Sequence, residues 1–413
     1  RRNNHRVSFI DCLDPYHPAM QIAGKKPQRL AYGNGKFFRQ VVTKPDTLNM
    51  LPRNYCRYGI SPDVFRAEIK RHQDADIVLI TSLMTYWYPG VFEAIGIIKE
   101  MLPHVPVVLG GKSATLCYDH TLGNSGADHI ISGAGEQQIL HLMRNLFGEQ
   151  PLSEPDPADL DSHPYPAFDL IRNLEQVPLI TSRGCPYQCT YCASHIFNER
   201  FIRRDPLKVA DEIEYWQNKF GVKNFAFYDD ALLVNPERMI IIILNEIKKR
   251  NLSCNFHCPN GLHLREITSD ISHLLYASGF KTIRFGFETS DFKRQTESGG
   301  KVKNEELENA VNHLKNAGYK TNEIGIYLLC GLPGQKAAEV IASIAFVRQC
   351  GAKPILAEYS PIPGTKMWAE AVETSPFDIK NEPLYHNNSL LPCRNDDFSF
   401  DAYNKIKAAL REK

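Results

Sequence analysis

The stretch Cys185-Pro-Tyr-Gln-Cys189-Thr-Tyr-Cys192 places three cysteines on one short polar loop, directly after the apolar run 179–181. Clustered thiolates bind zinc, copper(I) or iron–sulfur clusters. A structural zinc site takes four protein ligands, and His195 is the available fourth. An electron-transfer cluster takes four cysteines, but no fourth cysteine follows at a ferredoxin-like spacing. A cluster with three protein ligands leaves one iron open, and an open metal position indicates catalysis.

Downstream of this loop, apolar runs alternate with helical periodicity. Strands are predicted near 179–181, 224–228, 254–257, 282–287, 323–329 and 355–359, and helices at 207–219, 238–250 and 304–317. Six strand–helix units predict a partial (β/α)6 TIM barrel, whose functional residues lie at the carboxyl ends of the strands.

Upstream, residues 76–83, 105–109 and 128–131 are predicted strands, with a helix at 89–102 between the first two. Strands that alternate with helices predict a Rossmann-like, doubly wound parallel sheet. Ligands of such sheets bind beyond the carboxyl ends of the strands. The predicted fold class is therefore α/β, with two different parallel sheets.

These patterns divide the chain into four parts. We expect a Rossmann-like domain at 1–146, a Pro-rich linker at 147–174, the partial barrel at 175–374 and a C-terminal extension at 375–413. The chain starts at Arg1 rather than Met, so we expect the first domain to be truncated, with the natural N-terminus upstream.

Composition excludes several classes of protein. The 413 residues include 48 Lys and Arg against 47 Asp and Glu, and the net charge of +1 gives no signal of nucleic-acid binding. No apolar run is long enough to span a bilayer, and the first residues do not resemble a secretory signal. The 11 cysteines are odd in number, which disfavours a secreted disulfide framework. We therefore expect a cytoplasmic protein.

The Cys-x-x-x-Cys-x-x-Cys spacing, after a strand and with an aromatic residue before the last cysteine, resembles the radical S-adenosylmethionine (SAM) superfamily. The resemblance implies a [4Fe–4S] cluster bound by Cys185, Cys189 and Cys192, whose open iron chelates SAM. Reductive cleavage of SAM then yields a 5′-deoxyadenosyl radical. By its position, Tyr191 is expected to pack near the adenine.

Later strand ends agree with this resemblance. Phe227-Tyr-Asp229-Asp230 ends the second barrel strand, where a carboxylate can accept a hydrogen bond from the SAM ammonium. Alternatively, either aspartate caps the next helix. Gly286-Phe-Glu288-Thr-Ser290 ends the fourth strand, and the resemblance implies that Glu288 binds the ribose diol, with Ser290 nearby. Alternatively, Glu288 pairs with Arg284 or Lys301.

The first domain resembles the cobalamin (B12)-binding domain found in part of this superfamily. The resemblance rests on Thr81-Ser-Leu83-Met-Thr85, Gly110-Gly111 and Gly133-Ala-Gly-Glu136. It implies that Thr81, Leu83, Thr85, Gly110, Gly111, Gly133 and Glu136 line the cobalamin site. Tyr86 and Trp87 either cover the lower face of cobalamin or pack at a domain interface. The Asp-x-His-x-x-Gly motif of some cobalamin proteins is absent, and Asp14-Pro-Tyr-His17 is only superficially similar.

Together the resemblances imply an enzyme, a cobalamin-dependent methyltransferase that acts on an unactivated carbon. Alternatives are a radical enzyme for cyclisation, carbon–carbon coupling or another rearrangement, and a non-catalytic zinc-stabilised binding module. Expected partners are a small-molecule or peptide substrate and an electron donor such as flavodoxin or ferredoxin. The sequence identifies neither the substrate nor a catalytic residue beyond the cofactor ligands.

Overall fold

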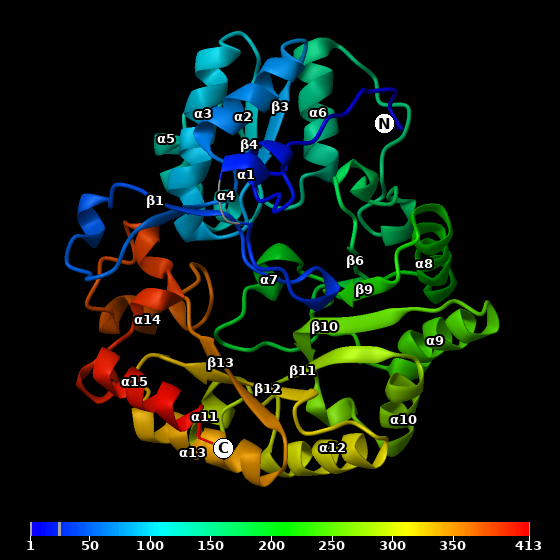
Figure 1. Cartoon of the computed structure of the whole chain (residues 1–413), viewed down its shortest axis with the longest axis vertical. Coiled ribbons are helices and arrows are strands. Elements are labelled where there is room, and N and C mark those ends of the chain that lie inside the picture. The colour runs from blue at the N-terminus through cyan, green and yellow to red at the C-terminus, as the bar shows by residue number, and fades with distance from the viewer. Residues whose placement is uncertain (1, 24–25, 413) are drawn as a thin grey trace. The chain divides into compact units, whose positions relative to one another are not determined.

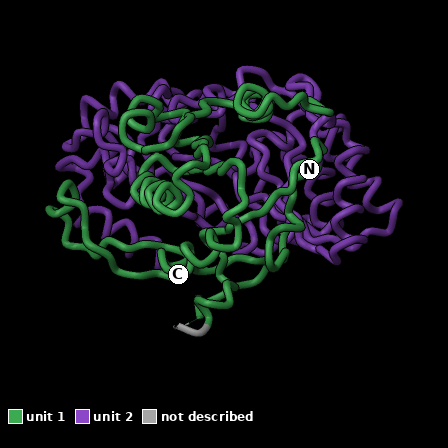
Figure 2. The backbone as a smooth tube through the Cα atoms, turned by 90° about the horizontal axis from the view of Figure 1, so that it is seen from above, with its two compact units in different colours: residues 1–154, 165–176 green, residues 155–164, 177–413 purple. Residues whose placement is uncertain are grey.

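The computed structural model describes residues 2–23 and 26–412. It forms two compact units, of residues 1–154 with 165–176 and of residues 155–164 with 177–413 (Figure 2). The chain passes between the units at 154–155, 164–165 and 176–177. Each unit is built around its own parallel sheet.

Unit 1 contains a three-stranded parallel sheet. Its strands are β3 (Val78–Thr81), β4 (Val107–Gly110) and β5 (His129–Ile130), in the order β3-β4-β5. The helices are α1 (Pro18–Ala23), α2 (Pro62–Ile69), α3 (Tyr88–Met101), α4 (Lys112–Leu116), α5 (Tyr118–Asn124) and α6 (Glu136–Phe147). A separate antiparallel ribbon joins β1 (Arg39–Val41) to β2 (Cys56–Tyr58).

The core of unit 1 lies between this sheet and the helices α2 and α3. Phe65 and Ile69 of α2 and Ile95 of α3 are buried against Val107 and Leu109 of β4. Helix α2 begins after Ser61, whose side chain accepts a hydrogen bond from the Val64 N–H, as an N-cap does. The apolar side chains of unit 1 are thus buried in this core, whereas polar and glycine residues lie at the carboxyl ends of the three strands.

Unit 2 is built on a six-stranded sheet, which Figure 1 shows with its flanking helices. The strands are β6 (Gln176–Leu179), β9 (Asn224–Phe227), β10 (Asn255–Leu262), β11 (Phe280–Glu288), β12 (Ile324–Cys330) and β13 (Lys353–Glu358). Their spatial order follows the chain from β6 to β13, and the pairs from β9 to β13 are parallel. This is the sheet of an open, partial barrel.

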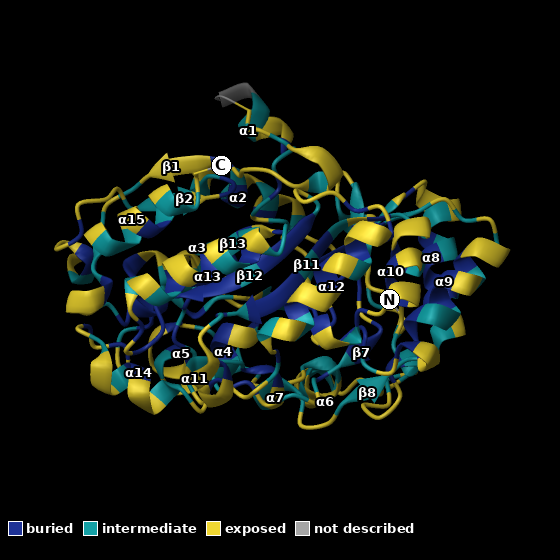
Figure 3. Ribbon diagram, turned by 90° about the horizontal axis from the view of Figure 1, so that it is seen from below, coloured by how far each residue is buried: buried dark blue, intermediate teal, exposed yellow. Residues whose placement is uncertain are grey.

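Helices connect these strands. They are α8 (Pro206–Phe220), α9 (Ile240–Lys249), α10 (Ser269–Ala277), α11 (Phe292–Glu297), α12 (Asn304–Asn316) and α13 (Ala337–Gln349). Short elements follow β6, namely β7 (Ser182–Arg183), α7 (Ser194–Phe197) and β8 (Ile202–Arg203), and α14 (Trp368–Thr374) and α15 (Phe400–Ala409) follow β13. The strands are largely buried, whereas α10 and α12 expose one face (Figure 3). Phe227, Phe256 and Phe280 stack in the core.

The structure confirms the predicted α/β class and both parallel sheets. The main difference is β10, which runs to Leu262 instead of ending near residue 257. Its register against β11 shifts after Cys258, so extra residues bulge out and lengthen the strand. None of the helices in the described residues combines the length and apolar character needed to span a bilayer.

Candidate functional site

The cysteine loop, residues 184–193, leaves β7 and returns through α7 to β8, which pairs antiparallel with β7. Gly184 has a φ of +84°, and a Cβ added there would lie 2.5 Å from the backbone oxygen of Arg200. Only glycine tolerates both this backbone conformation and this close approach. The hairpin itself therefore requires glycine at the start of the loop.

The end of α11 and the start of α14 hold the middle of the cysteine loop. The Thr190 N–H donates to the Ser298 carbonyl, after β11, at 3.2 Å, and the Thr190 carbonyl accepts from the Met367 N–H, after β13, at 2.9 Å. A Cβ added at Gly299 would lie 3.2 Å from the Cα of Cys189. Segments distant in sequence thus fix the loop at the carboxyl-terminal edge of the sheet.

Cys185, Cys189 and Cys192 are free thiols in one electrostatic neighbourhood. Burial raises the pKa of each, to about 11 for Cys185, and the Lys301 ammonium opposes that rise at all three. A thiol must lose its proton to bind a metal. A nearby ammonium group stabilises the resulting thiolate. Lys301 therefore favours metal binding by all three cysteines.

This donor set fits the predicted iron–sulfur cluster. Among the described residues, no three His, Cys, Asp or Glu side chains converge closely enough to hold one metal ion. A four-iron cluster binds each cysteine through a different iron, so its ligands stand farther apart than those of a single zinc ion. The loop offers three sulfur donors, the number that leaves one iron of the cluster open.

Asp229 follows β9 and is bonded within the fold. Its buried carboxylate accepts hydrogen bonds from the Thr181 N–H at 2.9 Å and from the hydroxyls of Thr181 and Ser182, both at 2.7 Å. Burial raises the pKa of Asp229, whereas these hydrogen bonds act to lower it. The carboxylate thereby ties the end of β9 to the segment that leads into the cysteine loop.

Asp230, the next residue, is exposed and lies near the cysteines. Its carboxylate accepts from the Ser194 hydroxyl at 2.5 Å and acts to raise the pKa values of Cys185 and Cys192. Of the two adjacent aspartates, Asp230 is the one that presents a carboxylate toward the cysteine loop. Asp229 instead holds the base of that loop.

Glu288 ends β11 at a bulge, with the strained φ of +72°. Its carboxylate lies 3.8 Å from the Lys301 ammonium and accepts a hydrogen bond from the Tyr191 hydroxyl. A Cβ added at Gly286 would lie 2.6 Å from Glu288 Oε1 and 2.9 Å from Lys301 Nζ. Non-glycine residues in this backbone region cluster at functional sites. The strand end is therefore shaped around the Glu288–Lys301 pair.

Tyr191 joins that pair to the cysteine loop. Together with Glu288, Lys301 and Ser298 it lines a small hollow. Burial and the Glu288 carboxylate raise the pKa of Tyr191, so its hydroxyl stays protonated and donates to Glu288. The predicted residues Tyr191 and Glu288 therefore come together beside Cys189.

Ser290 is turned away from this hollow. Its N–H donates to the Ser343 hydroxyl at 2.9 Å, and the two hydroxyls lie 3.0 Å apart. The prediction also left Lys301 out of the cofactor contacts. Only its position after Gly299-Gly300 distinguishes it in the sequence, and that position does not reveal its nearness to the cysteines.

In unit 1, the predicted cobalamin residues lie along one edge of the sheet. Thr81 pairs with Gly110, and Gly133 and Glu136 follow β5. Gly111 has a φ of +94°, and a Cβ there would lie 2.6 Å from Thr81 Oγ1. A Cβ at Gly133 would meet no atom within 4 Å, so the backbone there is open to a ligand.

Thr115 and Ser82, which the prediction did not include, bind these segments together. The Thr115 hydroxyl donates to the Gly111 carbonyl at 3.0 Å and accepts from the Gly133 N–H at 2.8 Å. The Ser82 carbonyl accepts from the Ser113 N–H at 3.2 Å. Loops that follow three different strands are thereby joined into one polar edge.

The β3–α3 segment adds apolar surface to this edge. Leu83 and Trp87 are 56% and 44% exposed, whereas Thr85 is buried. The Tyr86 and Trp87 rings meet edge to face at 6.5 Å. Exposed apolar side chains beside hydroxyls and open glycine backbone fit a large ligand with apolar and amide groups, as cobalamin has.

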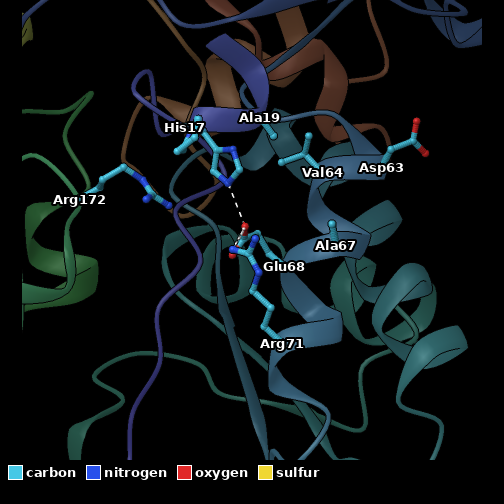
Figure 4. A pocket seen from close by; sticks show the side chains of 9 residues that line it. His17, Ala19, Asp63, Val64, Ala67, Glu68, Arg71 and Arg172 are labelled. Atoms are coloured by element: carbon cyan, nitrogen blue, oxygen red, sulfur yellow. Dashed lines mark hydrogen bonds and ion pairs between the residues drawn. The ribbon is translucent and has the colours of Figure 1, made fainter. Parts of the chain in front are cut away.

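A separate cavity of about 250 Å³ lies beside α2 in unit 1 (Figure 4). His17 Nε2 lies 3.1 Å from Glu68 Oε1, which also accepts from Arg71 at 2.7 Å, and Arg172 pairs with Asp14 at 3.0 Å. None of the predicted cobalamin residues lines it. His17 therefore stabilises packing against α2.

Comparison with known proteins agrees with both sites. The radical SAM superfamily matches residues 179–347, and the B12 binding domain matches residues 54–142. The first match contains the cysteine loop and the Glu288–Lys301 pair, and the second contains the polar edge of unit 1. The three predicted cofactors, a [4Fe–4S] cluster, SAM and cobalamin, are those of these two domains.

Several relatives span most of the chain. An uncharacterized methyltransferase of Pyrococcus horikoshii is 26% identical over 74% of this chain and 71% of its own length. Cytidylyl-2-hydroxyethylphosphonate methyltransferase of Streptomyces wedmorensis is 22% identical over 80% and 72%. An anaerobic magnesium-protoporphyrin IX monomethyl ester cyclase of Cereibacter sphaeroides is 29% identical, but over 42% and 33%.

A solved structure shares the fold. It is the radical SAM methyltransferase TsrM of Kitasatospora setae, with a TM-score of 0.63 at 16% identity, over 75% of this chain and 68% of that one. Two domain matches in sequence order, each coinciding with a structurally defined site, identify the chain. It belongs to the radical SAM superfamily, among the enzymes that carry a B12-binding domain.

Proposed function

We propose that this enzyme transfers a methyl group to an unactivated carbon of a small molecule or peptide. When bound, the [4Fe–4S] cluster supplies the electron that cleaves SAM, and cobalamin supplies the methyl group. The chain has to hold these groups, orient the substrate and exclude water from the radical.

One observation carries the proposal. Cys185, Cys189 and Cys192 are free thiols on one short loop, whose middle is held by backbone hydrogen bonds from the end of α11 and the start of α14, and the Lys301 ammonium lies near them. Three thiolates beside a cation, with no fourth cysteine on the loop, are the donor set of a cluster that keeps one iron for a ligand.

Four further side chains suit SAM. We assign the SAM ammonium to Asp230, because its carboxylate lies near the cysteines and is exposed. Glu288 would accept hydrogen bonds from ribose hydroxyls, and Lys301 would pair with the SAM carboxylate. Tyr191 would pack beside the adenine. Asp229 keeps a positioning role, since its Oδ1 accepts from the hydroxyls of Thr181 and Ser182 and its Oδ2 accepts from the Thr181 N–H.

The polar edge of unit 1 suits cobalamin. Open backbone at Gly133 and exposed side chains of Thr81 and Leu83 would contact the nucleotide tail and the corrin. Trp87, 44% exposed, would cover the lower face. Gly110, Gly111, Thr85, Tyr86 and Glu136 complete the assigned set.

Methyl transfer is favoured over other radical outcomes by the relatives. The two that cover more than 70% of both chains are named methyltransferases, whereas the cyclase matches 42% of this chain. The proposed reaction consumes electrons, so a one-electron donor such as flavodoxin or ferredoxin is the expected partner.

The test uses the chain reconstituted anaerobically with iron, sulfide and hydroxocobalamin. We expect about four irons per chain, 5′-deoxyadenosine on addition of SAM and dithionite, and transfer of label from methyl-labelled SAM to cobalamin. Cys189→Ala should abolish all three. Cys350→Ala is the matched control, because that free cysteine at the end of α13 lies outside the loop, and it should retain them.

Each outcome is decisive. A colourless chain that binds zinc instead of iron would defeat the proposal in favour of a metal-stabilised binding module. Cleavage of SAM without label transfer to cobalamin would retain the radical chemistry and reject methyl transfer.

A further inference from the structure

The carboxyl end of β10 carries a bulge that no cofactor assignment explains. Cys258 pairs with Ile283 of β11, but Leu262 pairs with Phe285, so β10 contains two extra residues. Gly261 lies in the bulge with a φ of +90°. Bulges are frequent next to active sites, where they redirect a side chain.

Hydrogen bonds from β12 and to the residue after β9 fix this bulge. The Tyr327 hydroxyl of β12 donates to the Pro259 carbonyl at 2.9 Å, and the Asn260 side chain donates to the Tyr228 carbonyl, after β9, at 2.7 Å. The bulge is therefore a defined part of the strand end, and it fixes the path of the chain that leads through Leu262 to His263.

His263 packs on the cysteine loop. Its ring is 3% exposed and meets the Tyr187 ring edge to face, with 4.4 Å between centroids. Tyr187 lies between Cys185 and Cys189. The Arg265 guanidinium lies 5.6 Å from the centre of the Tyr187 ring, and the Tyr187 hydroxyl donates to Glu266 at 3.4 Å. Residues 263–266 thus hold this interval of the loop.

One nitrogen of this buried ring lacks a partner. In the described part of the chain, His263 Nδ1 makes no hydrogen bond, although a buried unpaired polar atom costs about 1–3 kcal/mol. Burial, followed by the charges of Lys301 and Arg265, lowers the pKa of His263 to about 3, so the ring is neutral. The contact with Tyr187, which lies between Cys185 and Cys189, places this ring beside the cysteine loop.

We propose that His263 donates a hydrogen bond from Nδ1 to a sulfur atom of the cluster bound by Cys185, Cys189 and Cys192. The inference rests on the proposed function. The bond would favour the reduced cluster, which is the more negative form, and so raise its reduction potential. His263 would also position the loop through its contact with Tyr187.

The test compares two variants of the full-length, reconstituted chain. His263→Phe keeps an aromatic edge against Tyr187 but removes the donor, whereas His263→Gln retains a donor. We expect His263→Phe to bind the wild-type amount of iron with a more negative midpoint potential, measured by redox titration followed by electron paramagnetic resonance. His263→Gln should restore the potential toward that of the wild type.

His257→Phe is the matched control, because it removes a different buried histidine, which lies within β10 before the bulge, and its potential should equal that of the wild type. Equal potentials for His263→Phe and wild type, both with full iron content, would overturn the inference and leave the proposed function intact. Iron lost from a folded His263→Phe and restored in His263→Gln would support the role of the donor. A wild-type chain that binds no cluster would overturn the proposed function itself.

Discussion

Gly286→Ala should change the shape of the candidate SAM site while leaving the stability of the fold nearly unchanged. The new Cβ would lie 2.6 Å from Glu288 Oε1 and 2.9 Å from Lys301 Nζ, well inside normal contact. Both atoms are the far ends of side chains that can move, whereas a backbone atom cannot. The substitution should therefore displace the ion pair and leave β11 in place.

The expected energies differ between folding and binding. Moving side chains off their preferred rotamers costs about 0.5–1.5 kcal/mol, and the smaller entropy of the unfolded alanine chain offsets about 0.4–1 kcal/mol. The free energy of unfolding should thus change by at most about 1 kcal/mol. A hydrogen bond to a charged group contributes about 1.5–3 kcal/mol, so SAM should bind roughly 10- to 150-fold more weakly.

The assay measures the dissociation constant of SAM by equilibrium dialysis and the rate of 5′-deoxyadenosine formation with excess dithionite. Gly325→Ala on β12 is the matched control. Its Cβ would meet side chains just as closely, at 2.6 Å from Arg284 Cδ and 2.7 Å from Ile355 Cδ1, but it would not touch the Glu288–Lys301 pair. This control should bind SAM as the wild type does.

Unchanged SAM affinity in Gly286→Ala, with iron content and stability also unchanged, would refute the placement of SAM against Glu288 and Lys301. An equal loss of affinity in both variants would show that crowding of the sheet, rather than displacement of the pair, is responsible.

Three further results are expected. Asp229→Ala should lower the free energy of unfolding by about 1–3 kcal/mol in urea titrations, because the buried donors of Thr181 and Ser182 would lose the oxygen that accepts their hydrogen bonds. Gly111→Ala should lose cobalamin during gel filtration, because its Cβ would lie 2.7 Å from the Ser82 carbonyl oxygen at a φ of +94°. The pKa of His263, about 3 in the folded chain, lies below its unfolded value of about 6.5. His263 should therefore contribute a fall of about 1.4 kcal/mol per pH unit to the free energy of unfolding of the cluster-free chain as the pH drops from about 6.5 toward 3. His263→Phe should make the slope shallower in urea titrations at a series of pH values and leave the part due to His257, whose pKa burial lowers to about 4.

Local features were predictable from the sequence. The strands follow short apolar runs, and β9 begins at the predicted residue and ends one residue early. The three cysteines lie within eight consecutive residues, so this donor set can be recognised without knowledge of the fold. Glu288 lies at a strand end and Tyr191 within the cysteine loop, as predicted, and their contacts with SAM stay a prediction.

Features that depend on burial or on distant residues were not predictable. Asp229 and Asp230 are adjacent acids, and only the tertiary structure shows that the first is bonded inside while the second is exposed. Lys301 and His263 approach the cysteines from other strand ends. The position of His263 could not be predicted, because the bulge lengthens β10 and brings the strand end next to His263. A strand without the bulge would have ended earlier in the sequence.

The bonds that hold Thr190 have a consequence for how the protein matures. Ser298 and Met367 lie 108 and 177 positions after Thr190 in the chain. Translation adds about 5–20 residues per second, so roughly 10–35 s separate synthesis of Thr190 from synthesis of Met367. During that interval the cysteines are present without the contacts that shape their loop. Assembly of the cluster should therefore follow synthesis of Met367, and nascent chains that end before Met367 should not retain iron.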